Sequence, residues 1–220
     1  VWNFSRIVFK ARASQMVKKH QFSFPDVQIE HSEKLHQGFF SIDRITLRHR
    51  LFDGGWCDSI NRELFVRGEA VGVLLYDPIS ELVGLVEQFR IGALNDPMGP
   101  WQFEVVAGIM ETGESPSDVA YRELYEEAGL EVDTLVSICS YLVSAGGTDE
   151  KMHLYCGLAD LNGKSGIFGL SSENEDILLH VWHYDEVMEA KANGILNSAA
   201  VTIALQWLEL NREKMQDRLC

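Results

Sequence analysis

The segment from residue 108 to residue 130 holds six acidic side chains and a single basic one, Arg122, in a chain whose formal net charge is already −14. Its residues predict a helix, because Ser115 suits the N-cap, Pro116 suits the first helical position and Gly129 suits a left-handed end. At about 100° per residue, three apolar side chains fall on one arc of this helix and three carboxylates fall directly beside them. The apolar arc is Ala120, Leu124 and Ala128, and the acidic arc is Glu123, Glu126 and Glu127.

The acidic arc indicates a bound cation rather than a solvated surface. Like charges at Glu123 and Glu127, four residues apart, destabilise a bare helix by a few tenths of a kcal/mol. Clustered carboxylates at the edge of a buried face match the oxygen preference of Mg²⁺ or Mn²⁺. Gly108 and Gly113 are expected to give the backbone of the preceding loop the freedom of a turn.

The composition favours a small-molecule partner. A chain of 220 residues with 46% hydrophobic residues can bury a sizeable core. The acidic balance, with a pI of about 4.9, argues against nucleic acid and anionic membranes as partners, and we find no apolar run of the roughly 18–20 residues that span a membrane. The four cysteines lack the C-x-x-C spacing of a zinc site, so we expect reduced thiols and a cytoplasmic location.

Three regions follow from the pattern along the chain. Residues 1–25 carry basic residues and no acid, and they are either a transit peptide or, as we favour, an extension outside the core with Met16 as a plausible initiator. Residues 26–68 alternate in short runs about Asp53-Gly54-Gly55, which predicts a small antiparallel sheet. Residues 69–220 form an α/β unit with strands expected at 70–77, 81–91, 101–108, 134–144, 151–159 and 176–184, and helices at 185–194 and 198–219.

Two other motifs fail on spacing. Five residues separate Gly157 from Gly163, whereas a P-loop needs four, so ATP hydrolysis of that type is set aside. His180 and His183 face opposite sides if their segment is a strand, so we expect ordinary strand residues rather than a metal pair.

The acidic segment resembles the Nudix box, G-x5-E-x7-R-E-U-x-E-E-x-G-U with U aliphatic. The matching residues are Gly108, Glu114, Arg122, Glu123, Leu124, Glu126, Glu127, Gly129 and Leu130. This resemblance implies an α/β/α sandwich with a mixed central sheet that hydrolyses a nucleoside diphosphate linked to another group. A decayed enzyme that only binds is the alternative, and the complete set of glutamates favours turnover.

Beyond the box, the chain from about residue 26 resembles the bacterial ADP-ribose pyrophosphatase branch of that family. The matching stretches are residues 37–54, 61–68, 87–91, 144–150, 171–177 and 197–208. The resemblance implies hydrolysis of ADP-ribose to AMP and ribose 5-phosphate with two or three Mg²⁺ ions per site, in a homodimer that exchanges its N-terminal sheets. Ala145 stands where that branch typically has proline, which leaves open another nucleotide sugar, such as GDP-mannose, and, less favoured, a sensor that binds ADP-ribose without turnover.

The resemblance also implies roles for individual residues. The metal ligands would be the Ala107 carbonyl, Glu123, Glu127 and Glu175, while Glu126 lies near the metal and Arg122 orients the glutamates. Glu173 would act as the base from a mobile loop, although read alone its Ser-Ser-Glu-Asn-Glu-Asp run is a solvated loop. The substrate contacts would be Phe39, Arg62, Arg90 and Glu150.

Each of these substrate contacts has a plainer reading. Phe39 and Arg62 would stack on adenine and Arg90 would contact phosphate, while Glu150 would accept hydrogen bonds from the terminal ribose. Against this, Phe39 could be a core residue and Arg90 could simply pair with Glu87.

Overall fold

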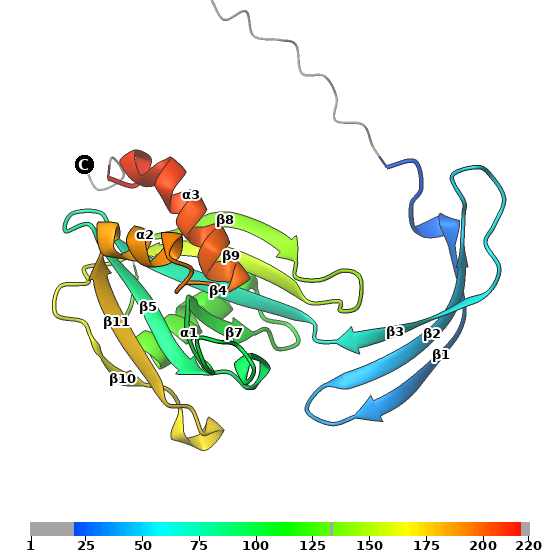
Figure 1. The fold of residues 1–220 in the computed structure, drawn as a ribbon, viewed down its shortest axis with the longest axis horizontal. Coiled ribbons are helices and arrows are strands. Elements are labelled where there is room, and N and C mark those ends of the chain that lie inside the picture. The colour runs from blue at the N-terminus through cyan, green and yellow to red at the C-terminus, as the bar shows by residue number, and fades with distance from the viewer. Residues whose placement is uncertain (1–19, 133, 217–220) are drawn as a thin grey trace, which may run out of the picture.

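The computed structural model describes residues 20–132 and 134–216, so most of the expected N-terminal extension lies outside the described residues. A small three-stranded sheet stands to one side of a larger α/β unit, and β3 leads from one to the other (Figure 1). The small sheet consists of β1 (Val27–Gln37), β2 (Ser41–His49) and β3 (Ile60–Val66), all antiparallel, after a short 3-10 turn at Phe24–Asp26. The expected small antiparallel sheet is confirmed.

The connection between β2 and β3 contains the turn that the glycine pair predicts. Gly54 and Gly55 have φ angles of 102° and 75°, which favour glycine, and the Gly54 amide donates to the Leu51 carbonyl at 3.0 Å. All side chains of β1 are exposed, so this sheet has little core of its own.

The large sheet has eight strands and is mixed. Its main order is β10-β11-β5-β4-β9-β8, where β4 and β9 are parallel and the other pairs are antiparallel, with β6 beside β5 and β7 beside β4. The strands are β4 (Glu69–Asp77), β5 (Leu82–Phe89), β6 (Trp101–Glu104), β7 (Val106–Ile109), β8 (Thr134–Leu142), β9 (Lys151–Leu158), β10 (Gly166–Phe168) and β11 (Ile177–His183).

Two helical layers cover this sheet. α1 (Pro116–Ala128) buries Ala120, Leu124 and Ala128 in one hydrophobic cluster, while α2 (Tyr184–Ala192) and α3 (Ala199–Gln216) bury theirs in a second cluster on the other side (Figure 1). The predicted α/β/α sandwich with a mixed sheet is confirmed. No helix in the described ranges is long and apolar enough to cross a membrane.

The expected single strand at 101–108 is wrong in one respect, because it breaks at the buried residue Val105. Its first half pairs with β5 and its second half pairs with β4, so the two halves take different neighbours. The break places Gly108 opposite Val71 and beside α1. The short strand β10 was not expected, because three residues are too few to show a period of two.

Candidate active site

α1 begins and ends where the sequence predicts. The Ser115 hydroxyl accepts a hydrogen bond from the Asp118 amide at 3.3 Å, and Pro116 is the first helical residue. At the other end Gly129 has a φ of 61°, and its amide donates to the Tyr125 carbonyl at 3.1 Å. These caps set the two ends of the helix, and burial of Ala120, Leu124 and Ala128 turns that side toward the sheet.

That inward face carries two carboxylates. Glu123 is 8% exposed and Glu127 is 2% exposed, and one oxygen of Glu127 accepts a hydrogen bond from the Ala107 amide at 2.9 Å. Burial raises the pKa of Glu123 to about 7, against the opposing charge of Arg122. Burial likewise raises the pKa of Glu127 to about 8, although the Ala107 amide opposes it. For both carboxylates, burial therefore outweighs the nearby positive charges, Arg122 for Glu123 and Arg90 for Glu127.

Arg122 gathers the acids around one guanidinium. Its Nη1 donates to Glu123 at 2.7 Å and to Glu126 at 3.2 Å, while its Nε donates to Glu114 at 3.3 Å. Nη2 also reaches the Ile109 carbonyl at 3.4 Å, which ties the helix to the strand before it. These contacts support the expectation that Arg122 orients the glutamates.

Gly108 is required for a reason that the sequence did not indicate. It lies in β7 rather than in a turn, and a β-carbon there would meet Glu123 Oε1 at 1.6 Å. The expectation of a turn glycine is therefore wrong for Gly108, because the space belongs to a carboxylate. For Gly113, whose φ is 96°, the turn is confirmed.

The loop between β10 and β11 brings a further acid to the helix. The Gly169 amide donates to the Glu126 carbonyl at 3.2 Å, and the Leu170 amide donates to the Glu175 carboxylate at 3.3 Å. The negative charge of Glu175 contributes to the raised pKa values of Glu123 and Glu127, so Glu175 lies close enough to repel both carboxylates. Glu173 ends the 3-10 turn Ser171–Glu173 in the same loop, but its side chain lies outside the described part of the structure.

Arg90 pairs with Glu104 and not with Glu87. Its Nε donates to Glu104 Oε2 at 2.7 Å, whereas Glu87 is bound to His180 Nε2 at 2.7 Å. The alternative pairing fails because residues three apart in an extended segment face opposite sides of the sheet. The charge of Arg90 also lowers the pKa of Glu127, so Arg90 acts on the helix carboxylates. The sequence analysis did not single out Glu104, because its contact with Arg90 depends on the pairing of β5 with β6.

The remaining predicted substrate residues lie on the small sheet or at its base. Phe39 is 87% exposed, so the reading of Phe39 as core is wrong, and its ring meets Phe40 edge to face at 4.7 Å. Arg62 is an exposed residue of β3, and in the single chain β3 and α1 belong to different parts of the molecule (Figure 1).

Glu150 stands where the two parts meet. Its carboxylate accepts a hydrogen bond from Arg67 Nη2 at 3.0 Å, and Arg67 lies 4.4 Å above the centre of the Phe40 ring. The Asp149 carboxylate accepts hydrogen bonds from the amides of Arg67 and Gly68 at 2.7 and 3.2 Å. The sequence analysis did not identify Arg67 either, because its local pattern does not indicate that it binds the Glu150 carboxylate.

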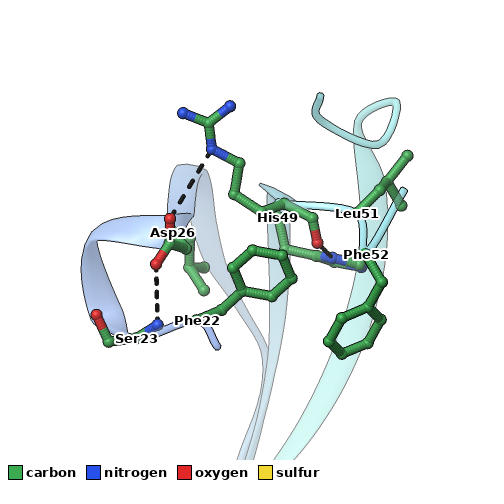
Figure 2. A pocket seen from close by; sticks show the side chains of 8 residues that line it. Phe22, Ser23, Asp26, His49, Leu51 and Phe52 are labelled. Atoms are coloured by element: carbon green, nitrogen blue, oxygen red, sulfur yellow. Dashed lines mark hydrogen bonds and ion pairs between the residues drawn. The ribbon is translucent and has the colours of Figure 1, made fainter. Parts of the chain in front are cut away.

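A separate apolar hollow of about 240 Å³ lies where β1 begins and β2 ends (Figure 2). The rings of Phe22 and Phe52 stand 5.1 Å apart at its side, and Asp26 binds the Ser23 amide and pairs with Arg50. It is lined by Phe22, Ser23, Asp26, Val27, His49, Arg50, Leu51 and Phe52, none of which is a predicted site residue.

The carboxylates of α1 fit a divalent cation in their chemistry. In the described part of the chain, no group of three or more His, Cys, Asp or Glu side chains already converges as metal ligands. Nevertheless Glu123 and Glu127 are buried, offer only oxygen and lack sufficient positive charge, which is the environment that Mg²⁺ or Mn²⁺ stabilises.

The chain is similar to a known protein family and to curated enzymes. Residues 66–202 match the family model of the NUDIX domain. The chain belongs to the Nudix family. It is 42% identical to the ADP-ribose pyrophosphatase of Haemophilus influenzae over 205 residues, which are 92% of this chain and 94% of that protein. It is 43% identical to the ADP-ribose pyrophosphatase of Escherichia coli K12 over 196 residues, which are 89% of this chain and 94% of that protein.

Less similar proteins include one that acts on a different nucleotide sugar. A GDP-mannose pyrophosphatase of Cronobacter sakazakii is 27% identical over 186 residues, which are 84% of this chain and 96% of that protein. A solved structure of an ADP compounds hydrolase has a TM-score of 0.63 at 18% identity and covers 86% of this chain and 98% of its own. The latter likeness shows the shared fold.

Proposed function

We propose that this Nudix hydrolase cleaves the pyrophosphate of ADP-ribose to AMP and ribose 5-phosphate with Mg²⁺. The observation that carries the proposal is the pair Glu123 and Glu127, which α1 buries on one face within reach of the charges of Glu175 and Arg90. The relatives of 42% and 43% identity named ADP-ribose pyrophosphatase support ADP-ribose as the substrate.

The chain's own residues would divide the work. Glu123, Glu127, Glu175 and the Ala107 carbonyl would hold two or three Mg²⁺ ions, which neutralise the pyrophosphate and make a water molecule more acidic. Arg122 keeps Glu123 and Glu126 in place, as its hydrogen bonds indicate.

Two further groups would act on the water and the phosphates. Glu173 would accept the proton of the attacking water from its loop beside Glu175. Arg90 would bind a phosphate, since its guanidinium acts on Glu127 and is 43% exposed.

We also propose that the enzyme is a homodimer in which the small sheet of one subunit completes the site of the other. The support is the exposure of the small sheet, where Ile29 is 59% and Phe39 is 87% exposed. In such a dimer, Phe39 and Arg62 would reach the adenine bound at the partner subunit, whereas within one chain they belong to the small sheet and not to the unit that contains α1. We place the enzyme in the cytoplasm, because Cys57, Cys139 and Cys156 are free thiols.

Subunit mixing tests this composite site. Arg62→Ala and Glu127→Gln should each be inactive alone, and refolding them together should give heterodimers with one intact site made from both subunits. Recovered turnover would support the exchange, whereas a mixture as inactive as its components would refute it. Mixing Glu127→Gln with Glu123→Gln is the control, because both lesions fall in the same part of the site and no intact site can form.

The substrate is tested by a panel of nucleotide sugars with and without Mg²⁺. We expect ADP-ribose to give AMP and ribose 5-phosphate with the highest kcat/KM, and EDTA to stop the reaction. GDP-mannose is the second candidate, because a 27% identical relative is a GDP-mannose pyrophosphatase and Ala145 replaces the expected proline. A higher kcat/KM for GDP-mannose would overturn the assignment, and binding of ADP-ribose without products would indicate a sensor.

A further inference from the structure

We infer that Glu104 is a positioning residue that holds Arg90 by one edge and so presents the rest of its guanidinium to the pyrophosphate. The inference rests on the proposed function, since it concerns how the substrate's phosphates are bound. Glu104 would not touch the substrate and would act through Arg90.

The register of β5 and β6 brings the two residues together. Val86 is opposite Glu104, and Arg90 follows the last residue of β5. The Arg90 side chain reaches back so that its Nε donates to Glu104 Oε2 at 2.7 Å, while its amide donates to the Pro100 carbonyl at 2.7 Å. The arginine is therefore held through both its backbone and its side chain.

A third residue fixes the acceptor. Gln88 is 6% exposed, and its Nε2 donates to the same oxygen of Glu104 at 3.3 Å. The side chain of Glu104 is 21% exposed against 43% for Arg90, so the carboxylate is the sheltered partner and the guanidinium the open one. A less exposed, hydrogen-bonded carboxylate next to a more exposed guanidinium is the arrangement expected if Glu104 orients Arg90.

The contact uses one edge of the guanidinium. Arginine has five N–H donors in one plane, and among the described residues Arg90 donates its side-chain hydrogen bond through Nε. The Nη1 and Nη2 donors then remain for a planar, two-point contact with phosphate.

Glu104 would also keep the Arg90 guanidinium from pairing with other carboxylates of the site. Opposite charges attract, so an arginine without the Glu104 contact would be free to turn toward the carboxylates of α1 instead of toward the substrate. The anion of Glu104 offsets that attraction from the other side. Removing its charge should therefore weaken phosphate binding without removing any metal ligand.

The test is Glu104→Gln, which keeps the size of the side chain and removes its charge. Loss of a hydrogen bond between charged groups predicts a rise of about 10- to 100-fold in KM for ADP-ribose, with kcat changed by less than about threefold. Glu87→Gln is the matched control, because Glu87 lies on the same hairpin, binds His180 on the opposite face and should leave KM unchanged.

A double substitution shows whether Glu104 acts through Arg90. Arg90→Ala should raise KM by at least as much, and Glu104→Gln should add nothing in that background. The inference is overturned if Glu104→Gln leaves KM unchanged, if it lowers kcat alone, or if its full effect persists beside Arg90→Ala. An inactive wild-type enzyme would instead refute the proposed function, so the two failures are distinguishable, and thermal melting checks that each variant is folded.

Discussion

Gly108→Ala should disable the site by displacing one carboxylate. A β-carbon at residue 108 would lie 1.6, 2.0 and 2.6 Å from Oε1, Cδ and Cγ of Glu123. Contacts this short cannot be tolerated, so Glu123 must leave its place and lose its 2.7 Å contact with Arg122. Overpacking of this kind costs about 1–3 kcal/mol of unfolding free energy.

The expected results are a lower melting temperature and a lost metal response. For a chain of this size, the cost corresponds to a fall of roughly 2–12 °C in Tm. Since the displaced group is an expected Mg²⁺ ligand, we also expect kcat to fall by about 10²-fold or more and the Mg²⁺ midpoint to rise. Differential scanning fluorimetry and a Mg²⁺ titration of ADP-ribose turnover measure both.

Two variants separate the clash from other effects of alanine. Gly92→Ala is the control, because a β-carbon there meets nothing within 4 Å and should change neither Tm nor turnover. Glu123→Ala removes all three clashing atoms, so Gly108→Ala should cost little in that background. Normal turnover and Tm in Gly108→Ala, or an undiminished cost beside Glu123→Ala, would refute the reasoning.

Three further predictions concern the carboxylates proposed to act in the site. Glu127→Gln should nearly abolish turnover and raise the Mg²⁺ midpoint by more than about tenfold, whereas Glu131→Gln, at an exposed position, should do neither. Full activity of Glu127→Gln with an unchanged Mg²⁺ titration would contradict the placement of the metal on α1. Glu173→Gln should lower kcat by about 10² to 10⁴ with metal affinity and substrate Kd little changed, and the base is misassigned if Glu175→Gln or Glu126→Gln does so instead. In EDTA the protein should lose stability as the pH rises from about 4.5 toward 8, because the unfolded glutamates ionise near 4.5 while the pKa values of Glu123 and Glu127 in the fold are about 7 and about 8. Mg²⁺ requires the ionised carboxylates, so its binding should tighten over that pH range and release protons. Urea unfolding at pH 5 and pH 8, with EDTA or with Mg²⁺, measures both stabilities. Equal metal-free stability at the two pH values would contradict the expected pH dependence.

The sequence alone determined α1 and the character of its acidic face. Ser115, Pro116 and Gly129 act through hydrogen bonds and dihedral preferences within a few residues, so the ends of the helix could be predicted without knowing its neighbours. The regular turn of a helix likewise fixed that Glu123 and Glu127 lie together on one face. The two-part organisation and the mixed sheet were predicted from the alternation of residues and from the family resemblance.

The tertiary structure decided which distant groups meet that face. Arg90 could pair with Glu87 on sequence grounds, but the pairing of β5 with β6 gave it Glu104, and the pairing of β5 with β11 brought Glu87 to His180. The break at Val105 likewise placed Gly108 directly against the side chain of Glu123. These outcomes depend on strand register and on which strands become neighbours, and neither is encoded in the local preferences of the residues concerned.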